Sequence, residues 1–260
     1  MSDTSQMTSR VALDGVDDLV AVEEPLEIRV GGAPLAVTMR TPGHDEELAV
    51  GFLHGEGLLD LRSPVRAGLT DDLAANIVEV TATLTRDPGA RRFYTTSSCG
   101  VCGRGALDEV ALWAPDVGAR DTPQVSRELL AALPDRLRQP GFAATGGLHA
   151  TGLFDAAGTL LCVREDVGRH NAMDKVIGRQ LLDGALPLGD RLLCVSGRLS
   201  FELVQKAAMA GAPVLVGVGA PTSLAVSLAR ECGMTLGGFA REGRINVYAG
   251  ASRLSPAAGP

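Results

Sequence analysis

Several short segments of the chain alternate apolar and polar side chains, which is the pattern of half-buried β-strands. Residues 25–30 alternate in this way, Gly31-Gly32 follows as a turn, and residues 35–39 form the second arm of a predicted hairpin. Residues 77–84 alternate as well. Residues 45–59 instead carry apolar side chains at helical spacing behind an acidic first turn, which suits the positive end of a helix dipole. The first part of the chain is therefore predicted to be a small sheet with a helix.

From Gly141 onward, strand-like and helix-like segments alternate, and the predicted class is α/β (α+β). We expect strands over residues 160–163, 191–196, 213–218, 236–240 and 245–248, and helices over residues 124–137, 171–182, 201–210 and 221–231. The predicted division has disordered tails at 1–10 and 251–260, a sheet-plus-helix subdomain at 11–94, a loop of small residues at 95–106 and an α/β cofactor-binding domain at 107–250.

Composition and charge narrow the function classes. The net charge of -7 and the 3% aromatic content argue against a protein that binds nucleic-acid backbones or stacks single-stranded bases. Residues 1–98 hold 16 acidic and 8 basic side chains, and residues 99–260 hold 15 and 16, so an anionic ligand is expected on the second part. With no apolar run of about 18 residues and no signal-peptide pattern, we expect a cytoplasmic protein without membrane insertion.

Cysteine usage points to thiol chemistry or burial. The five cysteines are Cys99, Cys102, Cys162, Cys194 and Cys232, and an odd number in a cytosolic chain argues against a disulfide framework. Cys99 and Cys102 form a CxxC among small residues, and the nearby Arg104 would lower a thiol pKa. Such a pair can be half of a zinc site, a dithiol redox couple, a persulfide carrier or two unreactive thiols.

Zinc chemistry is disfavoured by the spacing of the ligands. A structural site needs four ligands, and the chain has no second CxxC, so we predict no metal. Zinc deaminases combine HxE with a later PCxxC. Here His44-Asp45-Glu46 precedes the CxxC, but Ser98 stands where the proline is required, which argues against a deaminase.

Three further polar clusters follow predicted strands. Residues 164–175, which include Arg169 and His170, hold seven charged or histidine side chains among twelve. The turn Ser196-Gly197-Arg198 follows a buried strand and precedes a helix, and residues 217–223 repeat that geometry one unit later, which favours a shared anion site at the strand ends. In residues 239–244 two arginines flank a Glu-Gly turn and suit bidentate phosphate contact. Taken singly, the first cluster also fits a solvated helix start, the second a pair of helix caps, and the third an exposed hairpin.

Taken together and in order, these motifs resemble the FdhD family of formate dehydrogenase accessory sulfurtransferases. The resemblance covers residues 24–248. Its most specific parts are Ser97-Ser98-Cys99-Gly100-Val101-Cys102-Gly103, the stretch Arg164 to Lys175, Ser196-Gly197-Arg198-Leu199-Ser200-Phe201-Glu202 and Gly238-Phe239-Ala240-Arg241-Glu242-Gly243-Arg244.

The resemblance implies a sulfur carrier that accepts persulfide sulfur from a cysteine desulfurase. The sulfur then passes to the molybdenum bis(molybdopterin guanine dinucleotide) cofactor that formate dehydrogenase requires. Carried onto this chain, Cys99 bears the persulfide and Cys102 is its partner. The resemblance also implies a homodimer and a cytidine deaminase-like three-layer domain, without zinc, beside a small N-terminal β-rich subdomain.

The same resemblance assigns cofactor binding to the segment that joins the last two predicted strands of the chain. GDP is expected to bind there as a fragment of the cofactor. These residues are Phe239, Ala240, Arg241, Glu242, Gly243 and Arg244. The polar clusters add Arg169, His170, Ser196 and Arg198 as further candidates. Two other function classes stay open, a non-catalytic carrier or chaperone of the cofactor and a dithiol redox protein.

Overall fold

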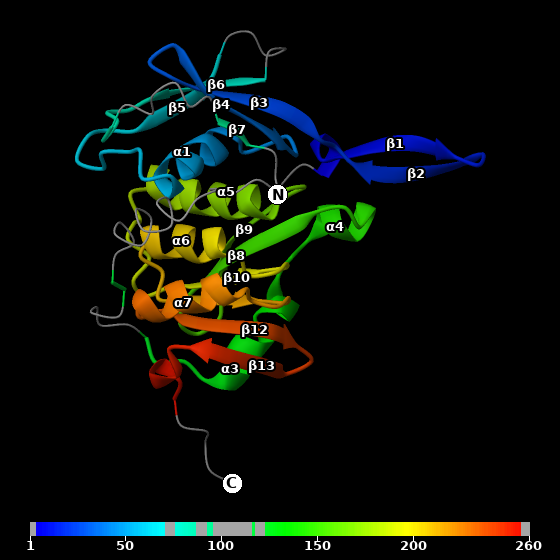
Figure 1. Ribbon diagram of the computed structural model, residues 1–260. Helices are drawn as coiled ribbons and strands as arrows, with labels where there is room; N and C mark the ends of the chain where they lie inside the picture. Colours follow the sequence, from blue (N-terminus) through cyan, green and yellow to red (C-terminus); the bar gives the residue numbers. More distant parts are fainter. Residues whose placement is uncertain (1–3, 71–75, 87–92, 96–115, 118–122, 256–260) are drawn as a thin grey trace. The chain divides into compact units, whose positions relative to one another are not determined.

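The computed structural model describes residues 4–70, 76–86, 93–95, 116–117 and 123–255 of the 260 residues. The chain forms two compact units, each built from segments that are separated in the sequence (Figure 1). Unit 1 comprises residues 1–99, 139–149 and 164–184, and unit 2 comprises residues 100–138, 150–163 and 185–260. Cys99 and Cys102 lie outside the described residues.

Unit 1 is built on a five-stranded sheet in the order β5-β6-β3-β4-β7. The strands are β3 (Glu24–Val30), β4 (Ala33–Arg40), β5 (Arg66–Leu69), β6 (Ile77–Thr81) and β7 (Phe93–Thr95). Strands β3 and β4 form the predicted hairpin, and Gly31 and Gly32 at its turn have left-handed φ angles of 59° and 79°. The alternating apolar residues of β3 and β6 pack with helix α1 (Asp45–Gly55) in one buried cluster. The predicted small sheet with a helix is confirmed.

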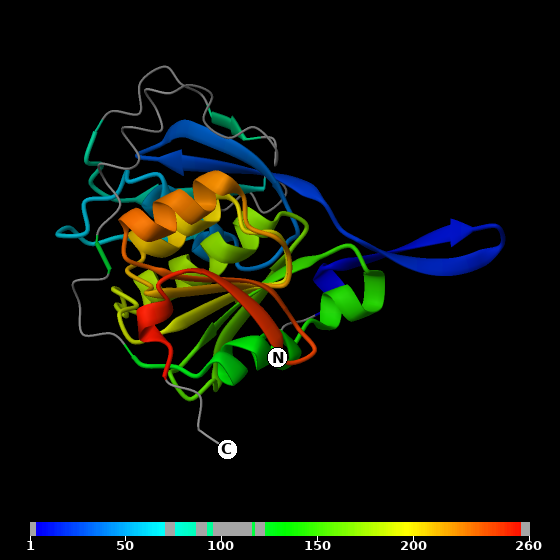
Figure 2. The same cartoon turned by 60° about the horizontal axis from the view of Figure 1, so that its bottom comes forward.

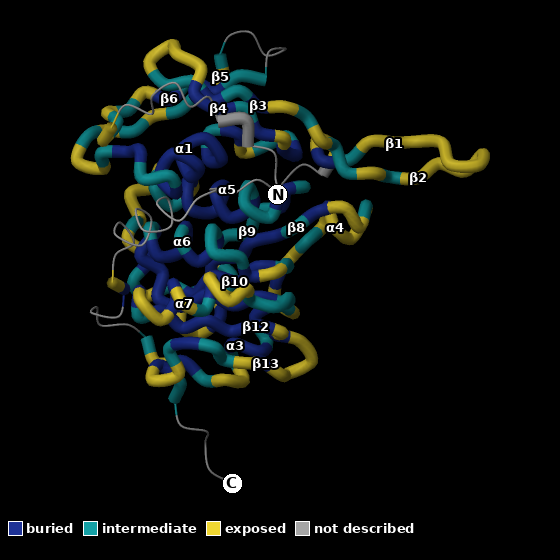
Figure 3. The backbone as a smooth tube through the Cα atoms, in the orientation of Figure 1, coloured by how far each residue is buried: buried dark blue, intermediate teal, exposed yellow. Residues whose placement is uncertain are grey.

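A close crossing of two helices brings α5 (Arg169–Leu182) into unit 1 (Figure 3). A Cβ atom at Gly51 of α1 would clash with the backbone of Asp174, and one at Gly178 of α5 would clash with the backbone of Glu47. These two glycines allow the helix backbones to meet. The predicted continuous domain over residues 107–250 is therefore wrong, because residues 139–149 and 164–184 fold with the N-terminal sheet.

A two-stranded hairpin precedes the sheet of unit 1. It consists of β1 (Thr8–Leu13) and β2 (Val16–Ala21), follows the short helix η1 (Thr4–Gln6) and contacts α4 (Pro140–Thr145). The predicted tail over residues 1–10 is therefore wrong for residues 4–10. The overlooked signal is Asp14-Gly15, whose φ angles of 50° and 82° form the kind of turn that favours tight hairpins.

Unit 2 contains a six-stranded sheet in the order β13-β12-β11-β10-β8-β9. The strands are β8 (His149–Phe154), β9 (Leu160–Asp166), β10 (Leu192–Val195), β11 (Val214–Gly217), β12 (Thr235–Arg241) and β13 (Arg244–Ala249). Strands β10, β11 and β12 are parallel neighbours, whereas β8 and β13 pair antiparallel to them. The predicted ends of β10 to β13 agree with the structure to within one residue. Strand β8 was not predicted.

Helices cover both faces of this sheet. Helices α6 (Phe201–Met209) and α7 (Ser223–Glu231) connect the parallel strands and lie on one face, and α3 (Arg127–Ala132) lies on the other (Figure 2). Leu130 and Leu133 pack there against apolar side chains of β8, β10 and β11. The mixed α/β class is confirmed, and the likeness to cytidine deaminases stays a prediction. Among the described helices, none is long and apolar enough to cross a membrane.

Two predicted boundaries in unit 2 need correction. The helix expected over residues 124–137 ends at Ala132 and continues only as the short helix η3 (Pro134–Arg136), because Pro134 has no N–H group to extend the α-helix. Residues 251–255 belong to the fold and not to a tail. Helix η4 (Ala251–Arg253) begins there, and the buried Arg253 donates a hydrogen bond to the Gly233 carbonyl at 2.6 Å.

Candidate functional site

In unit 2, three turns meet at the carboxyl ends of the parallel strands β10, β11 and β12. The N–H group of Gly219 donates to the Gly197 carbonyl at 3.0 Å, and the N–H group of Phe239 donates to the Gly219 carbonyl at 3.2 Å. The turns that follow β10 and β11 are therefore neighbours and the end of β12 joins them, whereas the shared anion site expected there stays a prediction. This edge of an α/β sheet is where such folds bind ligands.

Glycines make this close meeting of turns possible. A Cβ atom at Gly219 would lie 2.9 Å from the Cα atom of Arg198, and one at Gly238 would lie 3.0 Å from Cδ of Pro221. Because no side chain separates the turns, their backbone groups lie close enough to contact one ligand together. Gly219 belongs to the turn over residues 217–223 that the sequence motifs singled out, and the structure adds the reason why a glycine stands there.

Phe239 is held in an unusual backbone conformation beside these turns. Its φ of 53° is left-handed, and it lies at a bulge in the pairing of β12 with β13. This conformation costs a non-glycine residue on the order of 1–3 kcal/mol. The residue is 40% exposed, so its ring offers a surface for stacking a planar group. Ala240 is instead fully buried in the core of unit 2, so only its backbone could contact a ligand.

The β12–β13 hairpin presents two arginines side by side. Arg241 and Arg244 are directly opposite each other in the register, and the turn residues Glu242 and Gly243 have φ angles of 50° and 70°. Both arginines are exposed, and neither forms an ion pair with another described residue. Like charges that face each other across two strands repel. The pair is therefore suited to a multiply charged anion such as a phosphate.

The turn that follows β10 contains two candidate residues with different environments, Ser196 and Arg198. The Ser196 hydroxyl accepts a hydrogen bond from the Ala150 N–H group at 2.9 Å, and its own N–H group donates to the Ala150 carbonyl at 2.9 Å. Ser196 thus ties the turn to β8. Arg198 is exposed, which leaves its guanidinium group accessible to an anion.

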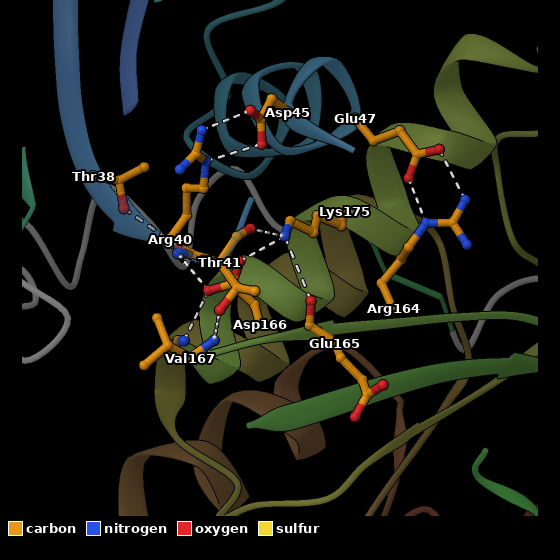
Figure 4. A network of polar contacts seen from close by, with 12 residues as sticks. Thr38, Arg40, Thr41, Asp45, Glu47, Arg164, Glu165, Asp166, Val167 and Lys175 are labelled. Atoms are coloured by element: carbon orange, nitrogen blue, oxygen red, sulfur yellow. Dashed lines mark hydrogen bonds and ion pairs between the residues drawn. The ribbon is translucent and has the colours of Figure 1, made fainter. Parts of the chain in front are cut away.

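The polar stretch 164–175 falls in unit 1, where Arg164, Asp166 and Lys175 contact residues of other segments (Figure 4). Arg164 forms two contacts with Glu47 of α1, Nε to Oε2 at 2.6 Å and Nη2 to Oε1 at 2.8 Å. The Glu165 carboxylate accepts the N–H groups of Gly141 and Phe142, which open α4, at 2.9 and 2.7 Å. These contacts bind the end of β9 to helices α1 and α4.

Asp166 and Lys175 form a buried ion pair with 2.7 Å between Oδ2 and Nζ, and their side chains are 0% and 1% exposed. Oδ2 also accepts the Thr41 N–H group at 3.2 Å. Oδ1 accepts the Gly168 N–H group at 2.8 Å and the Asn171 amide group at 3.0 Å. The carboxylate of Asp166 is therefore neutralised, and both of its oxygens are occupied.

Basic residues of the same stretch have a different environment. Arg169 and His170 open α5, and the Arg169 Nε is buried without a hydrogen-bond partner among the described residues. His149, the first residue of β8, lies near both. Burial and the positive charges of Arg169 and His170 lower the pKa of His149 from 6.5, and Asp166 opposes them. No sequence motif surrounds His149, so the sequence pattern carries no signal for it.

The described cysteines are Cys162, Cys194 and Cys232. Complete burial strongly raises the pKa of Cys194, and burial raises that of Cys232 to about 11. Neither thiol can form much thiolate at neutral pH. Cys162 is partly buried within β9. Within the residues that the structure covers, no group of three or more histidine, cysteine, aspartate or glutamate side chains is arranged to hold a metal.

Comparisons with known proteins agree with the sequence motifs. The sequence model of the FdhD/NarQ family matches residues 21–255. The chain is 55% identical over 256 residues to the sulfur carrier protein FdhD of Streptomyces coelicolor, covering 92% of this chain and 89% of that protein. It is 43% identical over 242 residues to the sulfur carrier protein FdhD of Saccharolobus solfataricus, covering 91% of each.

A solved structure shares the fold. A crystal structure from Desulfotalea psychrophila, whose description proposes a formate dehydrogenase accessory protein, matches with a TM-score of 0.72 and 26% identity, covering 95% of this chain and 97% of that one. Family match, sequence identity and fold agree over nearly the whole chain. The chain therefore belongs to the FdhD/NarQ family.

Proposed function

We propose that this protein is a sulfur carrier that holds a persulfide on Cys99, with Cys102 as its partner. The sulfur is passed to molybdenum bis(molybdopterin guanine dinucleotide) for use by formate dehydrogenase. The observation that carries the proposal is the identity of 43–55% to proteins named sulfur carriers, over 91–92% of this chain. The donor is a cysteine desulfurase, and the carrier works as a homodimer.

Loading of the carrier is a thiol exchange reaction. The Cys99 thiolate attacks the terminal sulfur of a persulfide on the donor, a new S–S bond forms at Cys99, and the donor cysteine leaves as a thiolate. The reaction needs no added oxidant, because one S–S bond replaces another. It does need a thiolate, and the raised pKa values of Cys194 and Cys232 make those two residues unsuitable. This supports the assignment to the CxxC.

The cofactor, which is the substrate of the transfer, fits the edge of the unit 2 sheet. Arg241 and Arg244 offer two adjacent guanidinium groups to its phosphates, and Arg198 adds a third positive charge. The exposed ring of Phe239 suits stacking of the guanine base. In this proposal the glycine-lined turns bind and orient the nucleotide end, and the cofactor itself supplies the molybdenum centre.

Mass spectrometry of the intact protein tests the sulfur-carrier assignment. After incubation with a cysteine desulfurase and cysteine, wild type is expected to gain the mass of one or more sulfur atoms, and a reductant should remove it. Cys99→Ala is expected to acquire no stable sulfur and to leave a client formate dehydrogenase inactive, because the receiving thiol is gone. Cys102→Ala should also be impaired, to a smaller extent. Cys162→Ala is the matched control and should behave as wild type.

Two results would contradict the proposal. Full client activation by Cys99→Ala would exclude a persulfide on that residue and would favour a carrier that only delivers the cofactor. Equal sulfur loading of wild type and of a Cys99→Ala, Cys102→Ala double variant would place the sulfur on another cysteine.

A further inference from the structure

The β1–β2 hairpin of unit 1 extends past helix α4, and most of it is uncovered (Figures 1 and 2). Residues 9–18 are all exposed. The two strands form a sheet of their own, so no third strand of the described chain pairs with them. A two-stranded hairpin is only marginally stable in water unless something packs on it. The family match begins at residue 21 and therefore assigns no role to these strands.

One face of this hairpin is apolar and open. Side chains alternate between the two faces of a strand, so the register assigns six of them to this face: Ser9, Val11, Leu13, Val16, Asp18 and Val20. Its four aliphatic members are between 38% and 69% exposed. The opposite face carries Leu19 and Ala21, which are partly buried. A cluster of exposed aliphatic side chains on one face is typical of a surface that binds another protein.

The outer edge of β2 offers backbone groups to an incoming strand. The strands join through the two-residue turn 14–15, so the pair of residues that flanks this turn is hydrogen-bonded and the next pair is not. With this alternation, the N–H and C=O groups of Asp17 and Leu19 point away from β1. The Leu19 N–H group donates instead to the Asp18 carboxylate at 2.8 Å, on the exposed surface. A third strand could replace this local contact with a ladder hydrogen bond.

The charge of the hairpin indicates which partner fits. Its strands and turn contain Asp14, Asp17 and Asp18 but only one basic residue, Arg10. Arg10 pairs with Asp17 at 3.5 Å, whereas Asp14 and Asp18 form no ion pair with another described residue. Pairing of β2 with the β2 strand of a second copy would bring four aspartates together, and like charges on neighbouring strands repel. Charge complementarity therefore favours a basic partner over a second copy.

We propose that the β1–β2 hairpin binds an extended segment of another protein, which adds to the edge of β2 as a third strand. The segment carries apolar side chains beside Val16 and Val20 and a lysine or arginine beside Asp18. Because these three residues alternate along one face of β2, the matching pattern is apolar, any, basic, any, apolar. Main-chain hydrogen bonds supply affinity and the side-chain pairs supply selectivity. This binding does not depend on sulfur transfer.

The probe is a capped peptide of sequence Thr-Val-Thr-Lys-Thr-Val-Thr, titrated into the full chain and followed by backbone amide signals in NMR. Saturable shifts are expected for Asp17 and Leu19, whose N–H groups face the added strand. The signals of Arg10 and Ala12, on the outer edge of β1, should change little. A matched peptide with Glu in place of Lys should bind about tenfold more weakly, because its carboxylate meets Asp18.

Three variants test the side-chain pairs. Asp18→Lys is expected to reverse the preference, so that the peptide with Glu binds more tightly than the peptide with Lys. Val16→Ser should weaken binding of the Lys peptide about fivefold to tenfold, because it removes an apolar contact. Leu224→Ser is the matched control. Leu224 is an aliphatic residue of α7 in unit 2 that is 48% exposed, and its variant should bind as wild type does.

Four results would overturn the proposal. Neither peptide shifts the hairpin signals, or wild type and Asp18→Lys bind both peptides equally. The signals of Arg10 and Ala12 shift in place of those of Asp17 and Leu19, which would assign the segment to β1. The hairpin signals move on concentrating the protein without peptide, which would assign the apolar face to a second copy. A failure of sulfur loading at Cys99 would leave all of these measurements unchanged, so the two proposals fail separately.

Discussion

Direct partners shift the pKa values of single residues in unit 1, and Glu47 is the clearest example. Burial alone would raise its pKa, but hydrogen bonds from Arg164 and His44 outweigh burial and lower the pKa from 4.5 to about 2. The folded protein then binds fewer protons than the unfolded chain between these two values. The stabilisation from Glu47 is complete above pH 4.5 and is lost as the pH falls toward 2.

Removing the partner of Glu47 should therefore change the acid stability. We expect Arg164→Gln to lower the free energy of unfolding by on the order of 2 kcal/mol at pH 7, and by much less near pH 3. Urea unfolding at the two pH values measures this difference. Arg62→Gln is the control, because Arg62 pairs with Asp60 on the surface and its side chain is 90% exposed. Equal losses at both pH values would mean that Arg164 acts through packing and not through the charge of Glu47.

At the scale of elements, the β12–β13 hairpin combines a tight turn with a costly arrangement of charge. Its turn requires left-handed residues at Glu242 and Gly243, and its register places Arg241 opposite Arg244. A hairpin with only a structural role gains nothing from two facing arginines. Its position next to the turns after β10 and β11 gives these charges a ligand-binding role in the proposed function.

We predict that Arg241→Ala and Arg244→Ala each weaken GDP binding about tenfold to a hundredfold, because each removes a charge-assisted contact to phosphate. Isothermal titration calorimetry measures the affinity. The matched control is Arg191→Ala, which removes an arginine of unit 2 that pairs with the neighbouring Asp190. If both hairpin variants bind GDP as tightly as wild type, the hairpin is not part of a nucleotide site.

At the scale of the whole molecule, the architecture depends on contacts between segments that are distant in the sequence. Unit 1 recruits α5 because Gly51 and Gly178 allow α1 and α5 to cross closely. This crossing also places Arg164 and Lys175 near their partners Glu47 and Thr41. The polar stretch 164–175 thus belongs to unit 1, whereas the other two polar clusters belong to unit 2.

Gly178→Ala tests this dependence. In a helix position with free space, alanine is more stable than glycine by about 1 kcal/mol. At position 178 the clash of the added Cβ atom with the Glu47 backbone therefore decides the sign of the effect. We expect a net loss of about 1–3 kcal/mol in the free energy of unfolding, measured by urea denaturation. Gly68→Ala in β5 is the control, because a Cβ atom there meets no atom within 4 Å. A Gly178→Ala protein as stable as wild type would show that the helices can separate without cost.

The sequence alone determined the local elements and the chemistry that depends on short motifs. Alternation and turn residues predicted β3, β4 and the strands from β10 to β13, because each signal lies within a few neighbouring positions. The same local signals identified the turns after β10 and β11 and the arginine hairpin. The CxxC also stands out in the sequence, but its role stays a prediction, because those residues lie outside the described part.

Only the tertiary structure decided which side chains of the motifs are structural. Residues 164–175 form one dense polar cluster in the sequence, yet Glu165 and Asp166 bind backbone N–H groups and Lys175. The Nε of Arg169 is buried without a hydrogen-bond partner among the described residues. The sequence also did not show that Ala240 is buried in the hydrophobic core, or that His149 begins a strand. Burial and pairing arise between residues that are far apart in the chain, and neither periodicity nor spacing carries information about such contacts.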